Sequence, residues 1–203
     1  MNWQEFTALL VLVTAMSITP GPNTTLSAAM AANHGLKRAL PFAVAVAVGW
    51  GLLLLLCVLG VGALLLAVPL LGLAIKIIGI TYLLWLGFRL AGINRLGEAN
   101  AASLQISFAQ GVGLQFVNIK AWMLALSIVG GWVAGRPDVV QRFLILTPLI
   151  MAYALASNVL YALVGSLMRD WLAGPAGTGR RLLGFNRVMA LALVGTALWM
   201  LLR

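Results

Sequence analysis

The sequence predicts an all-α polytopic membrane protein, with six transmembrane helices in a single domain of residues 1–203. Three observations carry this prediction. Of the 203 residues, 63% are hydrophobic and only 8% are charged. The mean hydropathy is +1.06, a value typical of chains that span lipid. The leucine run Leu52–Leu56 lacks the polar–apolar alternation of a membrane barrel strand, so the spans should be helices.

Six apolar segments can be marked along the chain, each long enough for the about 20 residues that cross a bilayer. The N-terminus has no basic region and no small-residue cleavage site, so we expect the first segment to be a retained helix rather than a signal peptide. The segments are residues 4–32, 39–67, 69–92, 106–134, 139–168 and 184–203.

The first segment is interrupted by Pro20, Gly21 and Pro22. Proline lacks a backbone donor and clashes with the preceding turn, so the helix should break there. Residues 6–18 are too few to cross a bilayer at a rise of about 1.5 Å per residue. The break should therefore lie at membrane depth, where a broken helix lines a cavity or packs within the protein.

A second half-helix should begin at Asn23, Thr24 and Thr25. The first N–H groups of a helix have no intrahelical partner and lie at the positive end of its dipole. Such a terminus binds anions, carboxylates included. Asn23 or Thr24 could also cap this helix, and capping leaves other donors available for a ligand.

The fourth segment carries Asn118 and Lys120 near its middle. An ammonium at the bilayer centre costs at least about 2.5–3.5 kcal/mol on insertion scales, so it usually faces a cavity or a partner. The alternative is a lysine that snorkels to the interface, but the nearer end of the segment lies beyond its reach. We therefore expect both residues to contribute to a binding site.

Two further polar features leave alternatives open. Lys76, near the outer end of the third segment, could snorkel or line a cavity. In the fifth segment, Tyr153, Ser157 and Tyr161 recur every four residues beside Asn158 and form one polar stripe. This stripe could hold helices together by hydrogen bonds or could line a cavity.

The distribution of acids and metal ligands excludes several function classes. All four acids lie at segment ends or between segments, and the chain has one histidine and one cysteine. We therefore expect no metal site, no cofactor and no catalytic acid–base pair, so the protein should not be an enzyme. The acids are Glu5, Glu98, Asp138 and Asp170; the histidine is His34 and the cysteine is Cys57.

The net charge of +9 reflects membrane topology rather than nucleic-acid binding, because basic residues concentrate in cytoplasmic loops. The side that follows segments one, three and five should be cytoplasmic, and both termini should face outward. That side carries Lys37, Arg38, Arg89, Arg95, Arg169, Arg180, Arg181 and Arg187, whereas the opposite side carries Arg136, Arg142 and Arg203.

The chain also has a weak internal symmetry. The second and fifth segments begin about 100 residues apart, and a similar offset separates Pro20–Pro22 from Asn118–Lys120. Two halves of three helices, approximately residues 1–92 and 104–203, must then be inverted relative to each other. Inverted repeats with interrupted helices at matching positions indicate a transporter with a central site.

At these residues the chain resembles the LysE/RhtB superfamily of amino-acid exporters. The resemblance covers nearly the whole length. It rests on five motifs in order: Thr19–Asn23, Gly35–Ala39 leading into Gly49, Ile75–Leu83 with Leu86-Gly87, Phe108–Gly111, and Asn118–Trp122. The last motif usually reads Asn-Pro-Lys-Ala. Because Ile119 replaces that proline, we expect the second break to be shallower than the first.

The resemblance implies export of amino acids or their derivatives across the bacterial inner membrane, driven by the proton-motive force. Without membrane-embedded acids, a neutral zwitterionic substrate fits better than a cationic one. We expect alternating access about a central site. Its expected substrate-binding residues are Pro20, Gly21, Pro22, Asn23, Thr24, Thr25, Asn118, Lys120, Tyr153 and Asn158, and its proton-coupling candidates are Lys120 and Lys76.

Two other functions stay open: a channel or ion-efflux pore, and an accessory membrane subunit in which Lys120 pairs with an acid of a partner. The lack of acid rings counts against a cation pore. The amino-acid substrate and the lipid bilayer are the expected partners. A homodimer is also open, because Gly131 and Gly135 have the Gly-x-x-x-Gly spacing of helix contacts.

Overall fold

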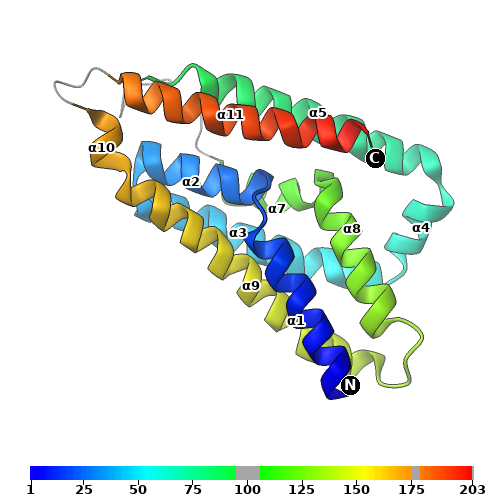
Figure 1. The fold of residues 1–203 in the computed structure, drawn as a ribbon. Coiled ribbons are helices and arrows are strands. Elements are labelled where there is room, and N and C mark those ends of the chain that lie inside the picture. Colours follow the sequence, from blue (N-terminus) through cyan, green and yellow to red (C-terminus); the bar gives the residue numbers. More distant parts are fainter. Residues whose placement is uncertain (95–105, 175–178, 203) are drawn as a thin grey trace.

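A computed structural model describes residues 1–94, 106–174 and 179–202 (Figure 1). Arg95, Glu98 and Arg203 lie outside these described residues. Every regular element within them is a helix, as the sequence predicts. The elements are α1 (Trp3–Ile18), α2 (Pro22–His34), α3 (Leu36–Val58), α4 (Val61–Ala67), α5 (Pro69–Ala91), α7 (Phe108–Val117), α8 (Ile119–Ile128), the π-helix η1 (Val129–Val133), α9 (Val139–Leu167), α10 (Arg169–Ala173) and α11 (Arg180–Leu201).

Four of these helices, α3, α5, α9 and α11, are each long and apolar enough to cross a membrane. Two further spans are bent pairs, α1 with α2 and α7 with α8 and η1. Counting each pair as one span gives six among the described residues, in agreement with the predicted number. The first and fourth segments are the broken ones, as their interruptions indicated.

The second break is sharper than the first, so the expectation drawn from Ile119 was wrong. The bend is 45° between α1 and α2 but 70° between α7 and the following helix. Asn118 makes the break without proline: its backbone is extended (φ −94°, ψ 99°), and its side-chain oxygen accepts the N–H of Lys120 at 3.1 Å. The carbonyl of Val117 then packs against Gly79 of α5, where no side chain would fit.

Two glycine-rich joins also differ from simple spans. The second segment divides at Gly60, whose φ of +96° suits glycine, so α3 ends at Val58 and α4 is a separate short helix. At the join between η1 and α9, η1 ends at Val133 and Gly135 lies in a turn with φ +69°. Gly131 and Gly135 therefore share no continuous helix face, and their spacing gives no support for a homodimer.

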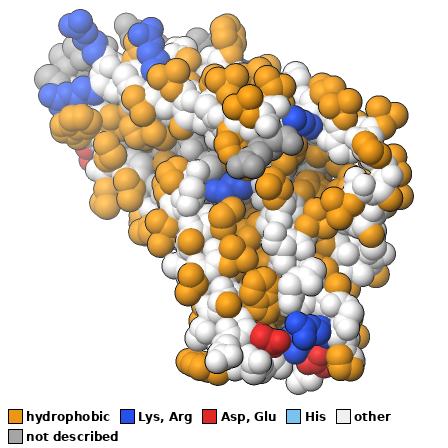
Figure 2. Space-filling model, turned by 45° about the vertical axis from the view of Figure 1, so that its right-hand side comes forward, with side chains coloured by type: hydrophobic (Ala, Val, Ile, Leu, Met, Phe, Trp, Pro, Cys, Tyr) orange, Lys and Arg blue, Asp and Glu red, His pale blue; other side chains and the backbone are white. Residues whose placement is uncertain are grey.

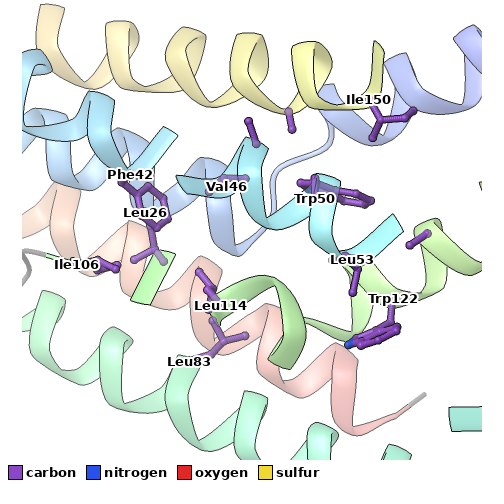
Figure 3. Packing of buried hydrophobic residues seen from close by; sticks show 14 of the residues in the cluster. Leu26, Phe42, Val46, Trp50, Leu53, Leu83, Ile106, Leu114, Trp122 and Ile150 are labelled. Carbon is purple, nitrogen blue, oxygen red and sulfur yellow. The ribbon is translucent and has the colours of Figure 1, made fainter. Parts of the chain in front are cut away.

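The core forms where helices from the two halves of the chain meet. α3 packs on α9, α5 packs on α11, and α2 packs on α3, α9 and α11; Figure 1 shows α5 and α11 side by side. Small residues let α2 approach closely: Gly165 of α9 lies against the backbone of Ala28 with no room for a side chain. Figure 3 shows Leu26, Phe42, Trp50 and Leu114 packed in this core.

Charges separate toward the two ends of the molecule. Figure 2 shows lysine and arginine side chains gathered at one end, and acidic side chains beside basic ones at the other. The helix ends that flank the joins after α2, α5 and α9 carry most of the basic residues, so these ends meet on one side. The described bases there are Lys37, Arg38, Arg89, Arg169, Arg180, Arg181 and Arg187.

Candidate functional site

A central cavity of about 70 Å³ lies where the two broken spans meet. This is less than half of the about 150 Å³ of a protein cavity that admits benzene, so the cavity must widen to take an amino acid. One wall is polar and the other is apolar. The polar wall includes Asn23, Thr24, Asn118, Lys120, Ser157 and Asn158, and the apolar wall includes Val13, Met16, Trp50, Leu124, Ile150 and Ala154.

The start of α2 forms one part of the polar wall. Pro22 is the first helical residue, a position where its missing N–H costs nothing. The backbone N–H of Gly21 donates to the hydroxyl of Thr24 at 3.0 Å, and this hydroxyl donates to the carbonyl of Gly21 at 3.2 Å. Thr24 thus stabilises the N-terminus of the helix, while the N–H groups of Asn23 and Thr24 have no acceptor among the described residues.

The start of α8 forms the second part. Asn118 is buried and caps the helix through the Lys120 N–H, so the positive ends of α2 and α8 lie at the same cavity. Two carbonyls released by the breaks are also engaged. The carbonyl of Phe116 accepts the indole N–H of Trp122 at 2.8 Å, and the carbonyl of Ile18 accepts the hydroxyl of Tyr161 at 2.8 Å.

The ammonium of Lys120 reaches across to α1. Its Nζ donates at 3.2 Å to the carbonyl of Thr19, the residue that follows α1 and caps its C-terminal end. A cation is favoured there because the carbonyl end of a helix carries partial negative charge. Lys120 also lines a second cavity of about 450 Å³ between the first break and α11; the two cavities share Met16, Thr19, Gly21 and Lys120.

The polar stripe of α9 serves both roles that its spacing left open, hydrogen bonding between helices and lining a cavity. The hydroxyls of Tyr153 and Tyr161 bond to Thr14 and to the Ile18 carbonyl, so both tyrosines tie α9 to α1. Ser157 and Asn158 line the central cavity. Asn158 also accepts the hydroxyl of Ser27 at 2.8 Å.

The sequence reasoning missed two side-chain amide pairs. Asn23 and Gln115 exchange hydrogen bonds of 2.8 and 3.2 Å, and Gln115 is fully buried against Gly49. Near the C-terminal end of α2, Asn33 and Asn186 exchange bonds of 2.8 and 3.1 Å. The available signal was an uncharged amide side chain within a segment expected to span the membrane.

Four expected site residues lie away from the central cavity. Pro20 lines the neighbouring cavity, Thr25 is buried in α2, and Tyr153 faces the groove between α1 and α9. Lys76 lines neither cavity, since its ammonium donates to the carbonyl of Leu201 at 2.9 Å, at the end of α11. The other seven expected residues all line the central cavity: Gly21, Pro22, Asn23, Thr24, Asn118, Lys120 and Asn158.

A cluster of charged side chains lies at the end of the molecule opposite the basic end (Figure 2). The guanidinium of Arg142 bonds to Asp138 at 2.8 Å and to Glu5 at 3.3 Å, and Arg136 lies 3.5 Å from Glu5. The hydrogen bond from Arg142 holds the pKa of the Asp138 carboxyl below its usual value. This cluster fixes the start of α1 to the start of α9. Among the described residues no group of three His, Cys, Asp or Glu could hold a metal.

Comparison with known proteins gives one family and one recurring kind of relative. Residues 14–203 match the family described as LysE type translocator. The cysteine/O-acetylserine efflux protein of Escherichia coli K12 is 30% identical over 188 residues, which are 90% of this chain and 89% of that protein. The same-named protein of Salmonella typhimurium LT2 is 27% identical over 158 residues, or 78% and 80%. No solved structure matches the chain.

Proposed function

The chain belongs to the family of LysE type translocators, and from that premise we propose that it exports neutral amino acids or their derivatives from the cytoplasm. As a member of this family it is a transporter and not an enzyme. The relatives are named for efflux of cysteine and O-acetylserine, so these two compounds are the leading substrates. Both are zwitterions without a charged side chain at neutral pH.

The observation that carries this proposal is the meeting of two helix N-termini, those of α2 and α8, at one cavity without a lining acid. The unpartnered N–H groups of Asn23 and Thr24 suit a carboxylate. Since no described residue lining the cavity is an acid, the cavity offers no counter-ion to a second positive charge. The apolar wall at Trp50 and Ile150 suits a short uncharged side chain.

Alternating access between two inverted halves is part of the proposal. Each half begins with a broken span, α1–α2 or α7–α8, and the second span of each half contains a proline, Pro41 or Pro148. The second spans pack on each other, and so do the third spans. This pairing supports a pseudo-two-fold relation of the kind found in secondary transporters.

The packing also supports an outward-facing state. α2, toward the basic end, buries eleven of its thirteen residues, whereas α1 buries only Leu9 and Val13 of its sixteen. The larger cavity lies beside the end of α1 and the C-terminal half of α11. The substrate path is therefore closed toward the basic end. Basic loops favour the cytoplasm, so we place that end on the cytoplasmic side of the bacterial inner membrane and both termini on the outer side.

Transport by purified protein in liposomes tests the function. Liposomes loaded with L-cysteine or O-acetyl-L-serine should release either compound with saturable kinetics, and faster under an imposed pH gradient. Liposomes loaded with L-lysine should release it no faster than protein-free liposomes do. Lys120→Met should lose the response to the gradient, and the matched variant Lys76→Met should keep it. Non-saturating conductance would indicate a channel, and activity that requires another subunit would indicate an accessory role.

A further inference from the structure

We infer that the backbone carbonyl of Thr19 is the subsite for the ammonium group of the substrate, and that the Lys120 ammonium occupies this subsite whenever substrate is absent. The inference rests on the proposed export of amino acids. It makes Lys120 a competitor of the substrate at one acceptor. Exchange of substrate for a proton then follows from competition between two ammonium groups for one carbonyl.

The geometry of the first break singles out Thr19. Among the carbonyls released where the two spans break, Ile18 is held by Tyr161 and Phe116 by Trp122, both at 2.8 Å, and Val117 packs against Gly79. The Thr19 carbonyl instead accepts Lys120 Nζ at 3.2 Å, and both residues line both cavities. It is thus a released carbonyl that a ligand could reach by displacing a flexible side chain, and among the released carbonyls it is the one that an ammonium group already occupies.

The substrate would span the distance between opposite helix ends. Its carboxylate would lie at the start of α2, and its ammonium at the end of α1, one residue before Pro20. These ends carry partial positive and partial negative charge respectively. A Cβ at Gly21 would lie 3.3 Å from Lys120 Nζ, so little space separates the lysine from the chain between the two ends. Withdrawal of Lys120 would also join the two cavities and supply the room that the central cavity lacks.

The proton balance is simple. The substrate keeps its own ammonium proton, and its carboxylate stays at the start of α2. The displaced Lys120, which then has neither the Thr19 carbonyl nor an acidic side chain beside it, releases one proton to water on the cytoplasmic side. After the substrate leaves on the outer side, Lys120 takes up one proton there and returns to Thr19. One proton therefore moves inward for each amino acid that moves outward, and no acidic side chain is needed.

Among the described residues that line the two cavities, Lys120 is the single titratable group. The charged and titratable groups on the helices around it face elsewhere. Glu5, Asp138 and Arg142 form the outer cluster. Tyr153 and Tyr161 bond to α1, Lys76 bonds to Leu201, and Arg89 lies over Trp85. Cys57 and Tyr82, on α3 and α5, line neither cavity. The basic end holds His34, in the last turn of α2, and Lys37, Arg38, Arg180, Arg181 and Arg187.

Proton release on binding tests the inference. The full chain in lipid nanodiscs is titrated calorimetrically with L-cysteine at pH 6.5 in two buffers of different ionisation enthalpy. At that pH the thiol of free cysteine, with a pKa of about 8.5, holds its proton. We expect about one proton released per L-cysteine bound, and an affinity that rises about tenfold per pH unit between pH 5.5 and 7.0. The analogue 3-mercaptopropionate, which lacks the ammonium, should release none.

Two variants keep the test decisive. Lys120→Met should bind L-cysteine without proton release and with an affinity independent of pH. Lys120→Arg, which retains a cation that does not deprotonate in proteins, should bind at least tenfold more weakly and release no proton, and it covers the case in which Lys120→Met does not fold. L-cysteine binding without proton release by the wild type, or equal release with 3-mercaptopropionate, would overturn the inference alone. If L-cysteine, O-acetyl-L-serine and L-threonine bind none of the three proteins, the proposed function falls as well.

Discussion

Asn23 and Gln115 exchange two hydrogen bonds, of 2.8 and 3.2 Å, between the first turn of α2 and the last turn of α7. The pair joins the two broken spans, and with them the two halves of the chain. Asn23 also lines the central cavity, whereas Gln115 is fully buried behind it. Uncharged amides therefore hold α2 to α7 beside the cavity.

Removing one amide of this pair should destabilise the protein. Gln115→Leu leaves the side-chain amide of Asn23 without its hydrogen-bond partner. A hydrogen bond between membrane helices contributes about 0.6 kcal/mol on average and up to about 1.7 kcal/mol. A double-mutant cycle of Asn23→Ala and Gln115→Ala, followed by the free energy of unfolding, should give a coupling energy in that range. Additive losses would show that the two amides do not stabilise each other.

Thiol labelling should report which side of the site is open. In a Cys57→Ala background, Thr196→Cys in the larger cavity should react with a membrane-impermeant maleimide from outside at least tenfold faster than Ser27→Cys reacts from the cytoplasm. Ser27 is fully buried in α2, and Thr196 lines the larger cavity. Adding Gln115→Leu should speed the cytoplasmic labelling of Ser27→Cys. Equal rates at the two positions would contradict the outward-facing assignment.

Ile119→Pro should be tolerated and should stabilise the protein. Ile119 is the first residue of α8, directly after the Asn118 cap, where proline suits the helix and its N–H has no intrahelical partner to lose. A compatible proline contributes about 0.4–1 kcal/mol by restricting the unfolded chain. Thermal unfolding should show a higher Tm.

The control for this variant is Ala121→Pro, two residues further along the helix. The N–H of Ala121 donates to the Asn118 carbonyl at 2.9 Å, so proline there removes a hydrogen bond and should cost about 0.5–1.5 kcal/mol. A similar loss of stability for Ile119→Pro and Ala121→Pro would contradict the position of the break.

Asp138→Asn should weaken the outer cluster in a pH-dependent way. The hydrogen bond from Arg142 lowers the folded-state pKa of Asp138 below the value of 3.8 expected for an unpaired carboxyl. Its contribution to stability is therefore complete above that value and is lost as the pH falls through the folded-state pKa. The Tm difference between wild type and Asp138→Asn should be present at pH 6 and should shrink below about pH 4. Asp170→Asn, at an exposed position, should cause no such difference; a gap that stays constant down to pH 2 would count against the ion pair.

The helical fold and its two breaks could be predicted because they depend on local chemistry. Pro20 and Pro22 cannot continue a helix, and Lys120 cannot lie at membrane depth without an acceptor. The bend angle at the second break could not be judged from Ile119. It depends on the Asn118 cap and on the contact between Val117 and Gly79, which are far apart in the sequence.

The amide pairs could not be predicted for the same reason. Nothing in the local sequence assigns a partner to Gln115 or Asn186, and only tertiary packing brings them to Asn23 and Asn33. Lys76 shows the reverse limit. It shares its residue type and membrane setting with Lys120, yet it lies at the end of α11 and outside both cavities.

The polar contacts that hold α2 against the second half of the chain carry no formal charge: Asn23 with Gln115, Ser27 with Asn158, and Asn33 with Asn186. Moving one elementary charge through the membrane field is worth about 2.3 kcal/mol per 100 mV, whereas separating these amides and hydroxyls moves none. The opening of this interface should therefore be indifferent to the membrane potential. Any voltage dependence of transport would then arise where Lys120 gains or loses its proton.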